Sequence, residues 1–156
     1  MSGGDELRET MHRYPVGVAV ASLEVRGTRL GLTLSSLVSL ALEPPLVGIS
    51  IGRHAAFHEL LREAGGFAVS LLAADQASLA RHFARGVPPI AMWEGIAVRD
   101  GERGPLLDGA VGWLECELGE ELAAGDHTLF LGRVERAEPG ADVPPLLRLW
   151  GDYRPT

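Results

Sequence analysis

Lysine is absent from this chain of 156 residues, and all 14 of its basic residues are arginine. The 21 acidic residues outnumber them and leave a formal net charge of −7 at pH 7. No stripe of basic residues interleaved with aromatic side chains occurs along the sequence. Because proteins bind nucleic acids through basic residues that neutralise phosphates, this composition argues against unaided nucleic-acid binding.

Cysteine and long apolar runs are also scarce. The single Cys116 excludes an intrachain disulfide and a metal site made of several cysteines, which fits a reducing cytoplasm. No apolar run is long enough to span a bilayer, and the acidic amino terminus lacks the charge pattern of a signal peptide. We therefore expect a soluble cytoplasmic domain that does not bind a membrane.

The spacing of apolar residues predicts many strands and few helices in one domain, residues 1–156, with residues 1–5 disordered. Strands are expected at residues 16–23, from 29 onward, and at 46–51, 67–72, 110–121, 128–138 and 146–150. Short helices are expected at residues 6–12, 54–64 and from Asp75, as N-cap, to about Ala84, with a loop at 86–95. Because no βαβ rhythm occurs, this order indicates a mainly β fold, an antiparallel barrel with short helical insertions.

Residues 31–56 hold the most informative pattern. Small hydroxyl residues, among them Thr33, Ser35 and Ser36, alternate with leucines before Pro44 breaks the run. A second apolar strand then leads to Arg53 and His54. Hydroxyls and amides at two neighbouring strand ends, followed by a cation, suit a phosphorylated, planar ligand. Two ordinary strands with a solvated Ser/Thr face would give the same pattern.

Several motifs, in the same order along the chain, resemble those of the flavin reductase-like family. The first is Gly31-x-Thr33-x-Ser35-Ser36-x-x-Ser39 followed by Pro44-Pro45-Leu46-Val47. Others are similar at residues 13–20, 67–72, 79–84 and 125–132, and the closing residues 149–154 are similar to the family's tail. In the opening strand, Pro15 or Val16 stands where the family usually has Thr or Ser.

The resemblance implies an FMN-binding split β-barrel, antiparallel and Greek-key-like. It also implies an NAD(P)H:flavin oxidoreductase of the two-component type. Such a protein transfers hydride from NADH or NADPH to flavin N5 and supplies reduced flavin to a separate flavin-dependent monooxygenase. FMN is the expected flavin, with FAD as the alternative, and a homodimer is expected because relatives bind flavin near a dimer interface.

The resemblance also implies site residues. Thr33, Leu34, Ser35 and Ser36 are expected at the flavin ring edge and ribityl chain. Phosphate contacts are expected from Ser50, Arg53, His54 and the helix start at Ala56. Further cofactor contacts are expected from Phe83, Tyr153 and Arg154. His127, in Gly125-Asp126-His127, corresponds to the family histidine on the nicotinamide side and is the expected catalytic residue.

Two of these residues also have plainer interpretations, and one motif departs from the family. Arg53 is compatible with a solvated loop cation, and a histidine after Gly-Asp is often a turn residue. Relatives have a Ser-x-Thr pair where this chain has His54-Ala55-Ala56, so two phosphate-binding hydroxyls are missing. The alternatives are therefore a flavin-binding split barrel with little reductase activity, or a split barrel repurposed for heme or a deazaflavin.

The remaining polar residues show no sequence signature of a catalytic or metal site. Glu115 and Glu117 are expected on a solvated strand face, and His58-Glu59 lacks a second histidine at the spacing of a zinc site. No metal is therefore expected. Cys116 lies within an apolar strand face and is expected in the core.

Overall fold

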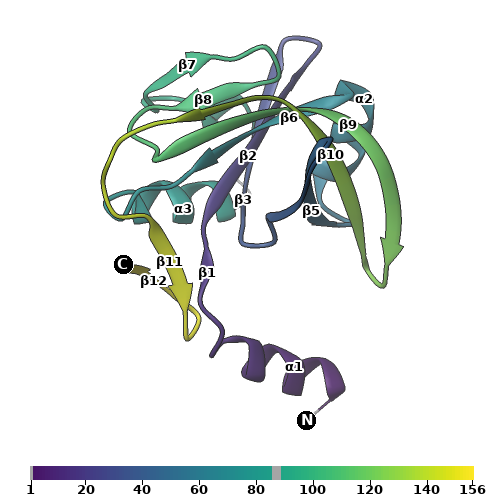
Figure 1. Ribbon diagram of the computed structural model, residues 1–156, viewed down its shortest axis with the longest axis vertical. Coiled ribbons are helices and arrows are strands. Elements are labelled where there is room, and N and C mark those ends of the chain that lie inside the picture. The colour runs from purple at the N-terminus through teal and green to yellow at the C-terminus, as the bar shows by residue number, and fades with distance from the viewer. Residues whose placement is uncertain (1, 86–88) are drawn as a thin grey trace.

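The computed structural model describes residues 2–85 and 89–156 and has a seven-stranded antiparallel sheet as its body (Figure 1). The sheet order is β3-β2-β6-β9-β10-β5-β4. The strands are β2 (Ala19–Val25), β3 (Thr28–Leu34), β4 (Val38–Leu42), β5 (Pro45–Gly52), β6 (Gly66–Leu71), β9 (Gly112–Ala124) and β10 (His127–Pro139). Every pairing in this sheet is antiparallel, which confirms the predicted fold class.

Two small sheets and four helices complete the chain. One small sheet is β1-β11-β12 and the other is the hairpin β7-β8. Their strands are β1 (Val16–Gly17), β7 (Val98–Asp100), β8 (Pro105–Leu107), β11 (Leu146–Leu149) and β12 (Asp152–Pro155). The helices are α1 (Gly3–Met11), α2 (Ala56–Ala64), α3 (Ala77–Ala84) and α4 (Pro89–Met92). Figure 1 shows α1 projecting away from the large sheet, beside the β11-β12 hairpin.

The core is built around all four phenylalanines of the chain. Phe57, Phe67, Phe83 and Phe130 are each at most 2% exposed. Phe57 comes from α2, Phe83 from α3, and the other two from the central strands β6 and β10. Side chains of this size stabilise a core by several kcal/mol when fully buried. The two helices are thus held against the sheet by the same core that the strands share.

The predicted single run through residues 31–40 is two strands. β3 ends at Leu34, β4 begins at Val38, and residues 35–37 belong to neither strand. The Thr33 hydroxyl donates to the Ala80 carbonyl oxygen of α3, 2.6 Å away, and thereby fixes the end of β3. The adjacent Ser35 and Ser36 interrupt the alternation of leucine and hydroxyl residues at this point, and this was the signal of the break in the sequence.

Several element boundaries were predicted wrongly. Helix α1 begins at Gly3 rather than following disordered residues, because Ser2 and Asp5 form a capping box. The N-cap of α3 is Gln76 and not Asp75. The expected loop at 86–95 contains α4, and residues 86–88 of it lie outside the described residues. The expected last strand at 146–150 is followed by β12, which the prediction lacked.

One face of β9 also differs from its prediction. Glu115 is only 4% exposed, and its carboxylate accepts a hydrogen bond from the Arg103 N–H at 2.9 Å. The turn at residues 101–104 covers it, so the predicted solvated position is wrong. Cys116 is buried as expected, and burial raises the pKa of its thiol to about 12, so it is protonated at neutral pH. In the described ranges, no helix is long and apolar enough to cross a membrane.

Candidate functional site

A cavity of about 640 Å³ lies where the β3–β4 break meets the N-terminal and C-terminal strands. Ser35 and Ser36 line it on one side, and its other walls are mostly apolar, including Leu37, Leu71, Val111 and Leu146. Ligand pockets typically measure about 300–1,000 Å³ and combine apolar walls with a few polar groups. The cavity therefore has the size and lining that a planar, amphipathic ligand needs.

Three backbone hydrogen bonds form a closed ring in the wall of this cavity. The Val18 N–H donates to the Leu146 oxygen at 3.2 Å, and the Leu146 N–H donates to the Leu72 oxygen at 3.0 Å. The Leu72 N–H completes the ring by donating to the Val18 oxygen at 3.0 Å. Three segments from the beginning, middle and end of the chain are therefore held together at the cavity wall.

The hydroxyl groups of the central motif have different partners. The Ser36 hydroxyl accepts from the Ser50 N–H at 3.0 Å and donates to the Ser50 oxygen at 3.1 Å, so it joins the β3–β4 break to β5. The Thr33 hydroxyl is bound to α3, as described above. Ser35 lines the large cavity and two smaller ones, and no hydrogen bond of its hydroxyl occurs within the part of the chain that the structure describes. Among these hydroxyls, that of Ser35 is the one best placed to bind a ligand.

His127 lies at the first position of β10, opposite Gly52 at the end of β5. Its Nδ1 is 2.8 Å from the Asp126 carboxylate, and its side chain is 47% exposed. Since a carboxylate accepts this bond from Nδ1–H, Nε2 is the ring atom left to face a ligand. The hydrogen bond from His127 is the largest cause that lowers the pKa of Asp126, so this carboxylate is ionised at neutral pH.

Arg53 and His54 follow β5 directly and lie beside the same hairpin. The Arg53 N–H donates to the Asp126 oxygen at 3.0 Å, and the charge of His54 contributes to the lowered pKa of Asp126. Ala56 is the first residue of α2, whose N-cap, Ala55, provides no side-chain hydrogen bond. The first-turn amides of α2 therefore lack a hydroxyl cap, in agreement with the departure seen in the sequence.

The structure does not bring all of these residues into one cavity. The large cavity is lined by Ser35 and Ser36 but not by Arg53, His54 or His127. Arg53 lines a separate polar cavity of about 310 Å³ on the α2 side. Strand β5 connects the large cavity with the region of His127. Its Ser50 contacts Ser36 at the cavity, and its Gly52, two residues later on the same face, is paired with His127.

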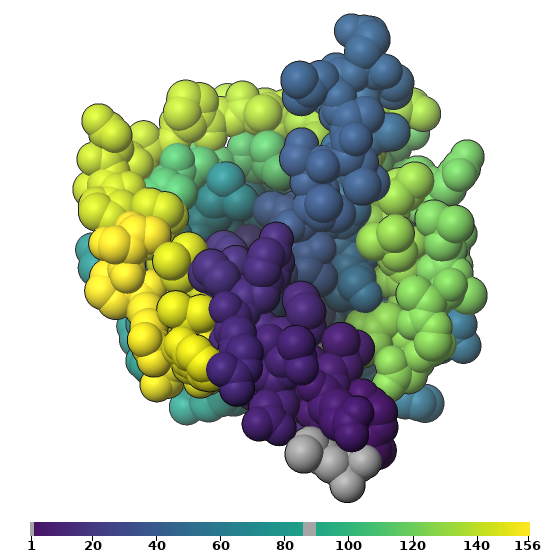
Figure 2. Space-filling view, turned by 60° about the horizontal axis from the view of Figure 1, so that its bottom comes forward, coloured from purple at the N-terminus to yellow at the C-terminus, as the bar shows by residue number. Residues whose placement is uncertain are grey.

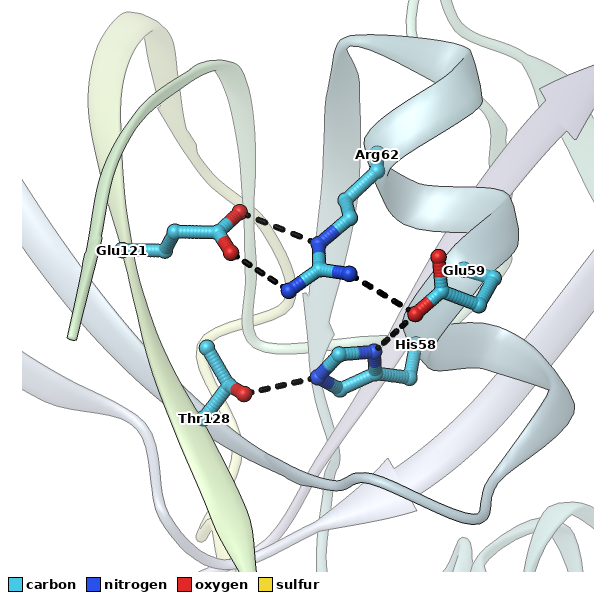
Figure 3. A network of polar contacts seen from close by, with 5 residues as sticks. All are labelled: His58, Glu59, Arg62, Glu121 and Thr128. Atoms are coloured by element: carbon cyan, nitrogen blue, oxygen red, sulfur yellow. Dashed lines mark hydrogen bonds and ion pairs between the residues drawn. The ribbon is translucent and has the colours of Figure 1, made fainter. Parts of the chain in front are cut away.

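A network of polar side chains lines this second cavity (Figure 3). His58 is 2% exposed, and its Nε2 is 2.7 Å from the Thr128 hydroxyl while its Nδ1 is 3.0 Å from Glu59. Arg62 contacts Glu59 at 2.8 Å and holds Glu121 with two nitrogens. The network joins α2 to the β9–β10 hairpin, so it fixes the helix that follows Arg53 against the hairpin that carries His127. The described residues contain no cluster that could hold a metal ion.

We expect Thr128→Val to destabilise the protein by about 1–3 kcal/mol, because it leaves the buried His58 Nε2 without a partner. Urea denaturation measures this change. In a His58→Leu background the same substitution should cost close to nothing, since both partners are then apolar. An equal cost in both backgrounds would show that the Thr128–His58 contact is energetically unimportant.

The remaining predicted site residues are dispersed. Phe83 is 1% exposed and packs against Trp93 with ring centroids 4.8 Å apart, so its side chain is part of the core and not of a cavity wall. Leu34 is 7% exposed and borders a recess of about 80 Å³ that Tyr153 also lines. Arg154 follows Tyr153 on β12 and so points to the opposite face of that strand.

Two wall-forming regions were absent from the predicted site. Val111 precedes β9, and the strand β11 contributes both Leu146 and Arg148. Arg148 could have been identified from the sequence, because it is a single charged residue within the apolar run of residues 146–150. The apolar wall residues could not, because their contact with the cavity depends on the pairing of β1 with β11.

Known proteins resemble this chain over nearly its whole length. Residues 11–156 match the family described as "Flavin reductase like domain". The reductase component of 4-hydroxyphenylacetate 3-monooxygenase from Thermus thermophilus is 35% identical over 150 residues, covering 96% of this chain and 95% of the relative. An NADH:FMN oxidoreductase from Rhodococcus erythropolis is 35% identical over 158 residues, covering 97% and 81%.

Solved structures agree with these sequence matches. The NADH:FAD oxidoreductase of Streptomyces globisporus, solved in complex with NAD and FAD fragments, superimposes with a TM-score of 0.91 at 35% identity. The match covers 97% of this chain and 92% of that one. The split-barrel fold that the sequence motifs implied is therefore confirmed.

Proposed function

The chain belongs to the flavin reductase-like family, and we propose on that basis that it oxidises NADH and passes the hydride to a flavin. It is an oxidoreductase and a component of the two-component monooxygenase type, as the names of its relatives indicate. The main observation in support of a flavin site is the cavity at Ser35 and Ser36. Relatives of similar identity are named for FMN and for FAD, so both flavins are candidates here.

The residues around the cavity fit a flavin. Its apolar walls suit the flat ring system, and the Ser35 hydroxyl with the neighbouring backbone of residues 35–37 offers hydrogen bonds to the ring edge. The flavin supplies the redox chemistry when bound, because its ring accepts the hydride. Ser36 acts indirectly, since its hydroxyl is used to hold the β3–β4 break against Ser50.

Arg53 and the first turn of α2 are our proposed contacts for the flavin phosphate. Arg53 forms no ion pair within residues 2–85 and 89–156, so its guanidinium has no competing carboxylate partner there. The α2 amides lack a side-chain cap and offer donors at the positive end of the helix dipole. Ser50 lies on β5 between Arg53 and the Ser36 contact at the large cavity, and His54 lies next to Arg53.

His127 is our proposed catalytic residue. Asp126 holds its Nδ1, which orients the ring and leaves Nε2 free to donate to or accept from a ligand group. In this position His127 binds and orients the reacting group, or compensates charge that develops during hydride transfer.

We propose a homodimer and a separate monooxygenase as partners. The edge strand β4 and the β9–β10 hairpin expose several large apolar side chains, namely Val38, Leu40, Leu42 and Leu122. A second copy of the chain would cover such a surface. Light scattering in solution tests this, and a monomeric mass would contradict it.

Oxidation of NADH by the purified protein, with FMN, with FAD and without flavin, tests the proposed function. We expect rapid oxidation only when a flavin is added, and the two flavins are then ranked by their kcat/KM. The absence of the family's hydroxyl residues at positions 54 and 56 motivates one alternative, a flavin-binding protein with little reductase activity. Tight flavin binding with no oxidation of NADH or NADPH would support that alternative. A heme or deazaflavin absorption spectrum would favour a repurposed barrel instead.

A further inference from the structure

Four arginines near the C-terminal hairpin differ from most other arginines of this acidic chain in their lack of an ion pair among the described residues. Arginines on the large sheet and on the hairpins beside it are paired with carboxylates, for example Arg62 with Glu121 and Arg103 with Glu135. In contrast, the described residues place no carboxylate in an ion pair with Arg13, Arg81, Arg148 or Arg154. Positive charge without a partner is therefore concentrated at one end of the molecule.

Tyr153 lies between two of these arginines. The guanidinium carbon of Arg81, from α3, is 5.6 Å from the ring centroid, and that of Arg148, from β11, is 5.9 Å away. The ring stabilises both cations but does not neutralise either of them. Asp152 lies beside Tyr153 in the sequence, but it projects to the opposite face of β12, like Arg154. Two guanidinium groups therefore contact one aromatic ring, and neither forms an ion pair with a carboxylate of the described residues.

Arg148 is connected to the large cavity through Ser35, and Arg81 is linked to Arg148 by the ring of Tyr153. Arg148 and Tyr153 line the 80 Å³ recess together with Thr33 and Ser35, and Ser35 also lines the large cavity. Figure 2 shows the C-terminal strands, in yellow, lying against the N-terminal segment, in purple, on this face. A ligand group in the large cavity would therefore reach Arg148 by passing Ser35.

Arg53 lies on the other side of Ser35 and Ser36 from Arg148. Ser36 is bound to Ser50 on β5, and Arg53 follows three residues later. Arginines without an ion pair among the described residues thus lie on both sides of the Ser35–Ser36 segment. Arg53 is reached along β5, and Arg148 is reached past Ser35. The reaction proposed above needs two phosphorylated ligands whose rings meet while their phosphates extend elsewhere, and each ligand requires its own cation.

We propose that Arg81 and Arg148, flanking Tyr153, form the site that binds the phosphates of the nicotinamide dinucleotide. The flavin phosphate is left to Arg53 and α2. The inference rests on the proposed function for the identity of this ligand. Guanidinium groups suit it because they bind phosphate oxygens with two parallel hydrogen bonds.

Steady-state kinetics of Arg81→Gln, Arg148→Gln and the double variant test the proposal. We expect each single substitution to raise the KM for NADH about tenfold, because a charge-assisted hydrogen bond is lost, and the double variant to raise it further. The Kd for FMN should change less than twofold. Arg148→Lys should recover part of the loss, since it keeps the charge and loses the fork geometry.

Arg133→Gln is the matched control, because Arg133 is an exposed arginine on β10 that lines neither cavity and is 3.8 Å from Glu117. It should leave the KM for NADH unchanged. Circular dichroism melts confirm that each variant is folded. The proposal is overturned if Arg148→Gln and Arg81→Gln raise the KM for NADH no more than this control does. It is equally overturned if they weaken FMN binding instead, since that result assigns them to the flavin.

Calorimetric titration of the full protein with ADP-ribose separates this proposal from the proposed function. ADP-ribose carries the dinucleotide's phosphates without its reacting ring. Binding that Arg148→Gln weakens about tenfold supports the site even if the wild-type protein oxidises no NADH. No binding to the wild-type protein, or equal binding to the variant, overturns the site even if the reductase activity is confirmed.

Discussion

Ser35→Trp is expected to weaken flavin binding about a hundredfold or more while leaving the melting temperature within about 2 °C of the wild-type value. The indole would fill the cavity of about 640 Å³ that Ser35 lines. Because the Ser35 hydroxyl has no hydrogen bond within the described ranges, the substitution removes no internal contact. Fluorescence quenching during titration with FMN gives the affinity, and a thermal melt gives the stability.

Two further variants at this segment sharpen the result. Ser35→Ala removes only the hydroxyl and should weaken flavin binding by a few-fold, as expected for one hydrogen bond. Ser36→Ala should mainly destabilise the fold, since it leaves the Ser50 N–H without the Ser36 hydroxyl. Normal flavin affinity in Ser35→Trp would show that the flavin binds elsewhere.

His127→Ala should lower kcat by about tenfold to a hundredfold and change the Kd for flavin less than threefold. The reason is that His127 lies at the start of β10 and does not line the cavity at Ser35, where the flavin ring is expected. Single-turnover measurement of flavin reduction under anaerobic conditions isolates the chemical step from product release.

Asp126→Asn is a milder substitution that tests the same role of His127. It keeps the shape of the side chain but removes the charge that orients His127, so an intermediate loss of kcat is expected. Loss of flavin binding in His127→Ala with an unchanged rate of reduction would remove the catalytic role proposed for this histidine.

The sequence predicted the β10 hairpin and the apolar strands well, because their signals are local. On either side of Gly125, apolar residues alternate with polar ones or form short runs, as expected for two strands. The tight turn at Gly125 is determined by the local sequence. The positive φ of 63° at Gly125 is one that glycine adopts easily. The order of motifs along the chain then placed these strands within a known fold.

The break at residues 35–37 was missed, although the adjacent Ser35 and Ser36 interrupt the alternation of leucine and hydroxyl residues there. The contacts that fix the break are with distant partners, since Thr33 donates to Ala80 and Ser36 bridges Ser50, and no local pattern predicts those partners. The burial of Glu115 has the same origin, since its partner is the Arg103 amide in a turn that folds over the strand. Residue type predicted which groups were polar but not which of them remained free for a ligand.

The ring of hydrogen bonds between Val18, Leu72 and Leu146 has a consequence for the order of folding. Its three segments are far apart in the sequence, so closing the ring costs more loop entropy than forming a hairpin, and among the described strands β1 pairs only with β11. The large sheet, in contrast, contains the hairpins β2-β3, β4-β5 and β9-β10, whose strands are neighbours in the sequence. We expect a refolding chain to form these hairpins first and to become able to hold a cofactor only when the ring closes.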